Sequence, residues 1–289
     1  MKKIIQVTFS ALTYLLVLSF FVPPAFSAPV LVWSDEFNED GVLPSERKWA
    51  YEVGFVRNEE LQYYTNANLK NIRQKGGNLI IEAHKESIEN PIYTPGAQNW
   101  RFAREYAQWS SASITTKQFQ TFDSGRIEIR AKVPTHSGFW PAVWLLGAGF
   151  QSSNTPNAHS SNWPAIGEMD ILEVNNNPVT TNHSSLHYDG DDGHYHMSTG
   201  AKPIDHADGF HIYAVQWDTN SISFSLDGQI FHSVMTDSTV GTNGVSPFTQ
   251  PMYMIVNLAV NNTGFAGPLD EAVESVQFEV DYIRYFKIE

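Results

Sequence analysis

The 289-residue chain has no cysteine and, after residue 28, no apolar run long enough to cross a bilayer. Without cysteine the fold cannot rest on disulfides, so its stability must come from a large buried core. Basic residues are scarce: 18 lysines and arginines stand against 31 aspartates and glutamates, a net charge of −13. Such a chain repels nucleic acids and anionic membrane surfaces, and a neutral partner suits it better.

The one long apolar stretch lies within residues 1–28. Its basic MKK start, its apolar run and its ending PPAFSA are typical of a secretory signal peptide cleaved after Ala28. An uncleaved membrane anchor is the alternative, because the run is nearly long enough to span a bilayer. After cleavage, 16 basic residues stand against 31 acidic ones, a net charge of −15. We expect residues 29–289 to form a single secreted domain, extracellular or periplasmic, without membrane contact.

Strand patterns dominate this domain. RIEIRAKV (126–133) alternates strictly between apolar and polar residues, which is typical of a half-buried antiparallel strand. Asp227-Gly228, within residues 221–234, is a two-residue hairpin signal. Further strands are expected at NLIIEAHK (78–85), FHIYAVQW (210–217), MYMIVNLAV (252–260) and VQFEVDYIRYF (276–286). Many strands, no long helical periodicity and no linker predict one all-β, two-sheet sandwich.

Three longer polar stretches interrupt the strands, at residues 86–109, 149–163 and 189–209. Long loops in a compact domain are often functional, although solvated surface is the plain alternative. The chain also carries 8 Trp, 12 Tyr and 18 Phe. Most of these rings must pack in the core. Some of them could line a groove.

Residues 166–177, IGEMDILEVNNN, place three acids in an apolar, β-favouring run. Acids in such a run cost free energy unless they are used. Side chains alternate along a strand, so Glu168 and Asp170 share one face while Glu173 should point to the other. A single β-bulge would bring Glu173 back to the acid face, and bulges are common beside active sites. The sequence therefore predicts a bulged strand with three carboxylates on one face.

Such an arrangement suits glycoside hydrolysis. With the bulge, the Cα atoms of the two glutamates lie roughly 13 Å apart, and their carboxyl groups can close to about 5–6 Å, as in retaining glycosidases. Repulsion among three close acids should raise at least one pKa. One ionised glutamate would attack the sugar carbon, and the other would protonate the leaving oxygen and then activate water. Acids on a solvated sheet edge, or a cation site, are the alternatives.

The stretch GEMDILE resembles the E-x-D-x-x-E signature of glycoside hydrolase family 16, in the bulged form of its laminarinase-like members. Blocks that resemble the family follow in the expected order along the whole domain: LVWSDEF (31–37), NEELQYYT (58–65), GNLIIEA (77–83), SGFWPAVWLLG (137–147), LHYDG (186–190), FHIYAVQW (210–217), FSLDGQ (224–229), MIVNLAV (254–260) and VDYIRYF (280–286). The resemblance implies an antiparallel, concanavalin A-like β-jelly-roll with a substrate cleft across its concave sheet. It also implies retaining cleavage of β-1,3-glucans or mixed β-1,3/1,4-glucans; relatives cleave galactans.

By motif, the resemblance implies that Glu168 is the nucleophile, Glu173 the acid/base and Asp170 the helper between them. Trp163 stands where the family places a ring against the sugar at the cleavage point, and Trp140 is a second expected platform. Flat aromatic surfaces pack against the C–H bonds of a pyranose face.

Three further residues are expected to bind the substrate. His187, in LHYDG, should lie beside the acids and hydrogen-bond Asp170 or a sugar, with a structural histidine as the alternative. Asn58 and Glu60 resemble residues that bind sugars on the non-reducing side. For Trp144 a core position is the better interpretation, because it lies deeper in its apolar run.

The resemblance also implies a structural calcium ion on the convex side, bound by the Asp281 carboxylate and by backbone oxygens near Glu36 and Gly77. Calcium takes six to eight oxygen ligands, and only one of these carboxylates is clear in the sequence. No cofactor is expected to be required for catalysis. The histidines around DGDDGHYH, including His183 and His187, have no zinc-binding spacing, and a polar surface loop is the better interpretation.

The substrate is less closely determined, because residues 54–62, 110–116 and 257–267 depart from the usual laminarinase pattern. We expect a monomeric endo-β-1,3-glucanase that acts on a polysaccharide of the laminarin type, with mixed-linkage glucan as a second substrate. A β-galactan hydrolase, acting on agar-type or lactosamine-type chains, is the alternative, because Arg57 could meet a sulfate or an extra sugar group. A non-catalytic, lectin-like binding protein is a further alternative, since a fold alone does not give function. The complete acid triad counts against it.

Overall fold

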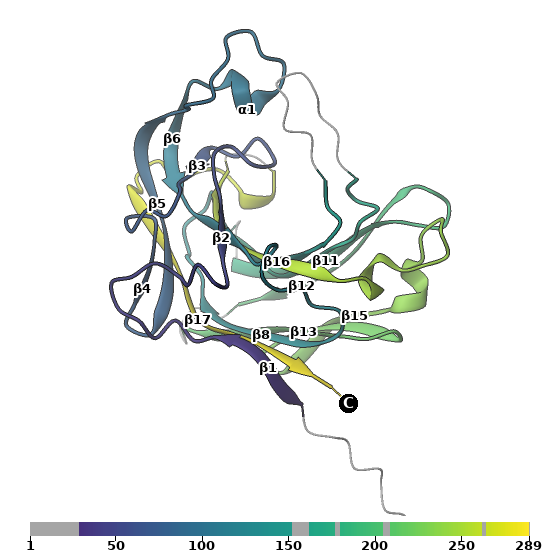
Figure 1. Cartoon of the computed structure of the whole chain (residues 1–289). Coiled ribbons are helices and arrows are strands. Elements are labelled where there is room, and N and C mark those ends of the chain that lie inside the picture. Colours follow the sequence, from purple (N-terminus) through teal and green to yellow (C-terminus); the bar gives the residue numbers. More distant parts are fainter. Residues whose placement is uncertain (1–28, 152–161, 177–179, 205–208, 262–263, 289) are drawn as a thin grey trace, which may run out of the picture.

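The computed structural model describes residues 29–151, 162–176, 180–204, 209–261 and 264–288, which form two packed β-sheets (Figure 1). The predicted signal peptide lies outside the described residues, so its cleavage stays a prediction. Within the described residues, none of the helices has the length and apolar character to cross a membrane.

The larger sheet has ten strands, eight of which follow the order β15 (Gln229–Met235), β14 (Ser221–Leu226), β13 (His211–Trp217), β8 (Gly125–Lys132), β17 (Ser275–Lys287), β5 (Asn78–Glu89), β6 (Tyr106–Ser111), β3 (Gln62–Tyr64). β1 (Val30–Asp35) adds to β17, and β4 (Ile72–Lys75) adds to β5. All pairs are antiparallel except β3 with β6, which is parallel. The sheet thus departs at one edge from the purely antiparallel sandwich that was predicted.

The smaller sheet has seven strands in the order β12 (Tyr195–Pro203), β11 (Thr180–Asp189), β10 (Glu168–Asn176), β9 (Phe139–Gly147), β16 (Met252–Val260), β7 (Ser113–Thr115), β2 (Ala50–Glu52). Helical segments are short: α1 (Trp100–Ala103) and the 3₁₀ turns η2 (Thr236–Thr239), η3 (Pro247–Thr249) and η4 (Gly264–Ala266). In Figure 1, β16, β11 and β12 lie in one layer and β8, β13 and β17 in the other.

The core lies between the sheets and is made by the alternation read in the sequence. Ile127, Ile129 and Ala131 of β8 are fully buried in it, while the polar residues between them lie on the other face. In β14, Ile222 and Phe224 are buried in the same way, and Asp227-Gly228 turns the chain into β15 with both residues at positive φ. The predicted strands at 78–85, 210–217, 252–260 and 276–286 are confirmed as β5, β13, β16 and β17.

Two of the three polar stretches contain more regular structure than was predicted, and most of the third is not described. Residues 86–109 contain the end of β5, helix α1 and the start of β6. Most of residues 149–163 lie outside the described residues. Residues 189–209, predicted as a loop, contain the nine-residue strand β12, whose exposure alternates along its length. β12 is an edge strand with one exposed face and one half-buried face, so it lacks the apolar signal that marks the other strands.

Candidate active site

The acid strand β10 carries the predicted bulge. Against β11, Asp170 lies opposite Ser185 and Glu173 opposite His183, so two residues of β10 face one residue of β11. Against β9 the pairing shifts between Asp170 and Leu172. One extra residue in β10 is thereby absorbed by the backbone, which is the irregularity that the odd spacing of the acids required.

The bulge sorts the side chains of β10 by polarity. Met169, Ile171, Leu172 and Val174 all belong to the core between the sheets, so Ile171 and Leu172 are consecutive residues that face inward. Every second residue of a regular strand would face inward, and this doubling is what returns Glu173 to the face of Glu168 and Asp170. The predicted acid face is therefore confirmed.

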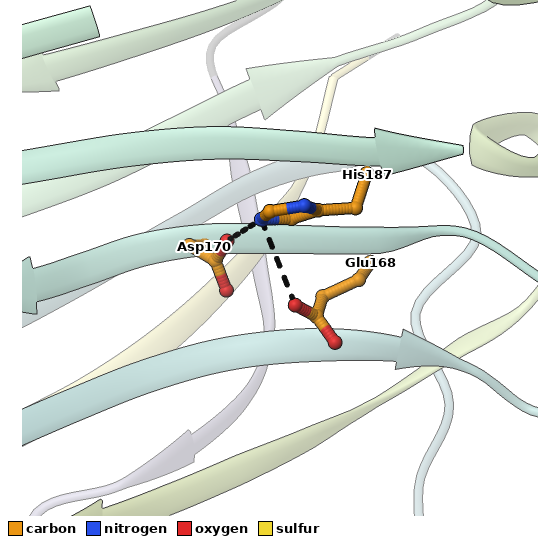
Figure 2. A group of neighbouring side chains, drawn as sticks. All are labelled: Glu168, Asp170 and His187. Atoms are coloured by element: carbon orange, nitrogen blue, oxygen red, sulfur yellow. Dashed lines mark hydrogen bonds and ion pairs between the residues drawn. The ribbon is translucent and has the colours of Figure 1, made fainter. Parts of the chain in front are cut away.

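Each of the three carboxyl groups has a hydrogen-bond partner. The Trp163 indole N–H donates to Glu168 Oε2 at 3.1 Å, and the Trp140 indole N–H donates to Glu173 Oε1 at 3.1 Å. His187 Nε2 lies 3.1 Å from Asp170 Oδ2 and 3.7 Å from Glu168 Oε1 (Figure 2). The structure thus brings six of the predicted site residues into one cluster.

A glycine turn places Trp163 against the first acid. Residues 163–166 form a turn closed by a hydrogen bond from Gly167 N to Pro164 O of 2.9 Å. Gly167 has φ of +81°, and a Cβ atom there would lie 2.8 Å from Pro247. Only glycine fits such a position without strain. The turn delivers the Trp163 ring beside Glu168 while leaving 40% of that residue exposed.

Burial dominates the electrostatics of the acids. Desolvation, followed by repulsion from Asp170, raises the pKa of Glu168 to about 8. Desolvation also raises the pKa of Asp170 to about 8. For Glu173, desolvation and then the charges of Asp170 and Glu168 raise the pKa well above its ordinary value. The expected rise is confirmed, with burial as its main cause and repulsion second, so the three groups are not all ionised at neutral pH.

The floor of the site beside the acids is apolar. Ala142, Trp144 and Leu146 of β9 form a second buried cluster with Tyr253 and Ile255 of β16, apart from the main core. Trp144 pairs with Asp170 across β9 and β10, so the two side chains share the acid face. Trp144 is buried, as expected, yet it lies under the site rather than between the sheets.

Arg57 covers this tryptophan. Its guanidinium carbon lies 5.0 Å from the centre of the Trp144 ring, and its Nη2 donates to Glu52 Oε2. Ser113 Oγ donates to the same Glu52 oxygen at 2.6 Å. Among the described residues, Arg57 Nη1 is buried without a hydrogen-bond partner. Since Glu52 neutralises the guanidinium, Arg57 is less suited to bind a sulfate than its position in the sequence suggested.

Asn58 and Glu60 lie on the loop before β3. Asn58 is exposed and has φ of +55°. Glu60 is only 3% exposed, and its carboxylate accepts hydrogen bonds from Gln62 at 2.7 Å, Tyr64 at 3.3 Å and Asn58 at 3.3 Å. Burial raises the pKa of Glu60. With its oxygens occupied by the protein itself, Glu60 is placed to shape this loop, and direct sugar binding by it stays a prediction.

Two residues at the site were missed in the sequence. Phe265 of η4 packs against Trp140 at 5.0 Å and His183 at 4.9 Å between ring centres, and so adds apolar surface next to the strand positions around Glu173. Tyr195, at the start of β12, lies 2.7 Å from His187 Nδ1. Both stand in segments without a strong sequence pattern. The alternating exposure of β12 offers only a weak signal for Tyr195.

Two groups of acidic side chains, one on the convex side and one in the cleft, are candidates for binding a metal ion. On the convex side, the Asp281 carboxylate is paired with Arg130, and Glu36 is held by Arg284 at 2.7 and 3.0 Å. Asp281 is the one side-chain ligand that the sequence predicted, and the Arg130 guanidinium neutralises its negative charge. Because calcium needs that charge, the side chains here fit the ion poorly. In the cleft, donor atoms of Glu168, Asp170 and His187 all lie within 4.8 Å of one another, close enough for a cation. His187 lies within hydrogen-bonding distance of Asp170 there, so an ion would compete with the imidazole for that carboxyl group.

Comparison with known proteins agrees with this geometry. The model of the family "Glycosyl hydrolases family 16" matches residues 59–284. A beta-glucanase of Rhodothermus marinus is 35% identical over 89% of this chain and 85% of its own length. Glucan endo-1,3-beta-glucosidase A1 of Niallia circulans is 31% identical over 91% of this chain, which spans only 39% of that longer protein.

Among solved structures, a strong match comes from work on endo-acting O-glycanases that members of the human gut microbiota express to initiate mucin breakdown. It has a TM-score of 0.79 and 32% identity, and covers 92% of this chain and 93% of its own. The chain is thus similar to proteins described for more than one kind of glycan.

Proposed function

Because this chain belongs to glycoside hydrolase family 16, we propose that it is an endo-acting β-glucan hydrolase that cleaves β-1,3-glucan of the laminarin type. One observation carries the proposal: the bulged strand β10 holds Glu168, Asp170 and Glu173 on one face of the smaller sheet, each with its own hydrogen-bond partner. A lectin would not need three buried acids at the cost of their mutual repulsion.

We propose a double displacement with retention. Glu168, ionised, attacks the anomeric carbon, while Glu173, protonated, gives its proton to the leaving oxygen. The bond from the anomeric carbon to that oxygen breaks as the bond to the Glu168 carboxylate forms. Glu173, now ionised, takes a proton from a water molecule, which attacks the same carbon and releases Glu168. The strong rise in the pKa of Glu173 supports its part as the acid.

The surrounding groups support the same division of roles. The indole N–H of Trp163 and the imidazole beside Asp170 stabilise negative charge on Glu168, and both lower its pKa against the effect of burial. The exposed face of Trp163 is available to pack on a pyranose ring at the cleavage point. Trp140 donates to Glu173 and offers a second ring on the other side of the acids.

The test is reducing-sugar release by residues 29–289 on laminarin, mixed-linkage glucan and agarose in parallel. We expect release from laminarin, with mixed-linkage glucan as a second substrate. Glu168→Gln keeps the size and a hydrogen-bonding capacity of the side chain but cannot attack, so it should lose nearly all turnover while still binding glucan. Equal activity of that variant would remove the nucleophile assignment, and an inverted product anomer by NMR would refute retention.

A second candidate is an endo-hydrolase of galactose-containing chains of the agar or lactosamine type. The similarity to a structure from work on endo-acting O-glycanases favours it. Including a lactosamine-type chain in the same assay separates the two candidates. Release from that chain or from agarose, with none from laminarin, would keep the mechanism and change the substrate.

We further propose that the enzyme is exported and acts as a monomer. The amino-terminal sequence of the exported protein should begin at Pro29, and light scattering should give the mass of one chain. An amino terminus at Met1 in a membrane fraction would instead support the anchor.

A further inference from the structure

Tyr195 opens β12 and lies against the acid site. β12 pairs with β11 so that Met197 is opposite His187, which makes Tyr195 the diagonal neighbour of that histidine. The turn before it is held by hydrogen bonds from Gly190 N to His194 O at 2.9 Å and from His194 N to Asp192 Oδ1 at 3.0 Å. The position of Tyr195 is therefore set by the hairpin.

The tyrosine hydroxyl meets the ring nitrogen of His187 that faces away from the acids. Tyr195 Oη lies 2.7 Å from Nδ1, while Nε2 lies 3.1 Å from Asp170 Oδ2 and 3.7 Å from Glu168 Oε1. Desolvation, together with the charges of Glu168 and Asp170, raises the pKa of Tyr195, so its phenol keeps its proton. A protonated phenol can donate this hydrogen bond, and Nδ1 accepts it when that nitrogen carries no hydrogen.

This donor decides which nitrogen of His187 carries hydrogen. A neutral imidazole has one N–H and one acceptor nitrogen. When the phenol donates to Nδ1, the hydrogen must be on Nε2, where it lies between two carboxylates (Figure 2). In the other tautomer a lone pair on Nε2 would face those same oxygens, which is unfavourable unless one of them is protonated.

We propose that Tyr195 is a positioning residue of the hydrolase, which selects the Nε2–H tautomer of His187 and so keeps one donor between Asp170 and Glu168. The inference rests on the proposed function, because it assigns Tyr195 a part in the use of those acids. It adds a link from the edge strand β12, through β11, to the acid strand.

The ring of Tyr195 has a separate part. It stacks on the His187 ring with centres 5.9 Å apart and planes at 11°, and it lies 5.6 Å from the Trp163 ring. Tyr195 is 50% exposed, so one face remains open. The Tyr195 ring thus holds the imidazole in place by stacking on it. Together with Trp163 it forms a larger aromatic surface that extends toward β12, and the Tyr195 ring can pack against a further sugar there.

The two parts can be separated by substitution. Tyr195→Phe keeps the ring and removes the hydroxyl, so kcat should fall roughly three- to tenfold, the net effect of one hydrogen bond, with KM nearly unchanged. Tyr195→Ala removes both, and KM should rise as well. Tyr106→Phe is the matched control, since Tyr106 is 51% exposed on the other sheet, and it should behave as the unaltered enzyme. Thermal unfolding checks that each variant folds.

A double-mutant cycle tests whether the hydroxyl acts through His187. In a His187→Ala background, Tyr195→Phe should have no further effect on kcat. An equal loss in both backgrounds would overturn the positioning role, as would an unchanged kcat of Tyr195→Phe in the native background.

An independent readout does not depend on turnover. The ¹⁵N chemical shifts of the His187 ring should show hydrogen on Nε2 in the unaltered protein and a mixture of tautomers in Tyr195→Phe. Hydrogen on Nδ1 in the unaltered protein would overturn the inference. The expected tautomer change in a protein that hydrolyses none of the tested glycans would support the positioning role and count against the proposed substrate.

Discussion

Two tryptophans each donate a hydrogen bond to one of the catalytic glutamates. Replacing them tests the assigned roles of nucleophile and acid/base through the pH dependence of activity. Trp163 donates to Glu168 and Trp140 donates to Glu173, both at 3.1 Å, and each contact lowers the pKa of its carboxyl group. Phenylalanine in either position keeps a flat ring and removes the N–H. The two substitutions are therefore matched, and each acts as the control of the other.

The expected size follows from the hydrogen bond. A bond to a charged group contributes about 1.5 kcal/mol, which corresponds to a pKa change of about one pH unit. Loss of the donor destabilises the ionised carboxylate, so the pKa of the affected glutamate rises in both variants. Glu168 must be ionised to attack, so its pKa governs the acidic limb of the pH–rate profile, and Glu173 must be protonated, so its pKa governs the basic limb.

Trp163→Phe should thus move the acidic limb up by about one pH unit and narrow the bell-shaped profile. Trp140→Phe should move the basic limb up by a similar amount and broaden it. The assay is kcat/KM on laminarin from about pH 4 to about pH 10, a range that brackets the ordinary and raised carboxyl pKa values. The comparison uses only the pH positions of the two limbs of the profile. The maximum rate also changes, because phenylalanine packs less well against a sugar ring than tryptophan does.

The result that would refute the roles is a reversal, in which Trp163→Phe moves the basic limb and Trp140→Phe the acidic one. Unmoved limbs in both variants would show that neither indole N–H contributes to the charge state of the acids. Because the acids interact, the limbs report properties of the group as a whole, and the direction of each movement decides the test.

Three further predictions concern catalysis, stability and metal binding. Glu173→Ala should lose most activity on substrates with poor leaving groups and regain part of it with added azide, which attacks the glycosyl-enzyme without base help; no azide effect would contradict the role of Glu173. Phe278→Ala should lower the free energy of unfolding by about 3–5 kcal/mol, measured in urea, since this fully buried ring fills the core between the sheets. EDTA should leave the Tm unchanged, because Arg130 already neutralises Asp281; a clear fall in Tm, restored by calcium, would show that the ion displaces the arginine.

The acid strand shows how far local patterning reaches. The spacing of Glu168, Asp170 and Glu173 in an apolar run predicts a bulge, because a regular strand cannot place all three on one face. Consecutive inward-facing Ile171 and Leu172 confirm it. The strands β8, β13 and β17 were predictable for the same reason, since one buried face leaves a period of two in the sequence. The strand β16 is buried on both faces, and its nearly continuous apolar run marked it instead.

β12 is a strand that the alternation of apolar and polar residues did not predict. It is an edge strand with no fully buried face, so its residues alternate only in how exposed they are. Its pairing with β11 makes it a strand, and that pairing brings Tyr195 to His187. A pattern without an apolar face does not reveal such a strand in advance.

The sequence by itself determined the all-β class, the acid face and the family, because strand periodicity, the spacing of the acids and each family motif are patterns within short segments. Tertiary structure alone decided the contacts that tune the site. It put Arg57 on Trp144 rather than free in the cleft, and it paired Asp281 with Arg130. These contacts join residues far apart in the chain, and their geometry follows from strand register and sheet packing, which no local period records.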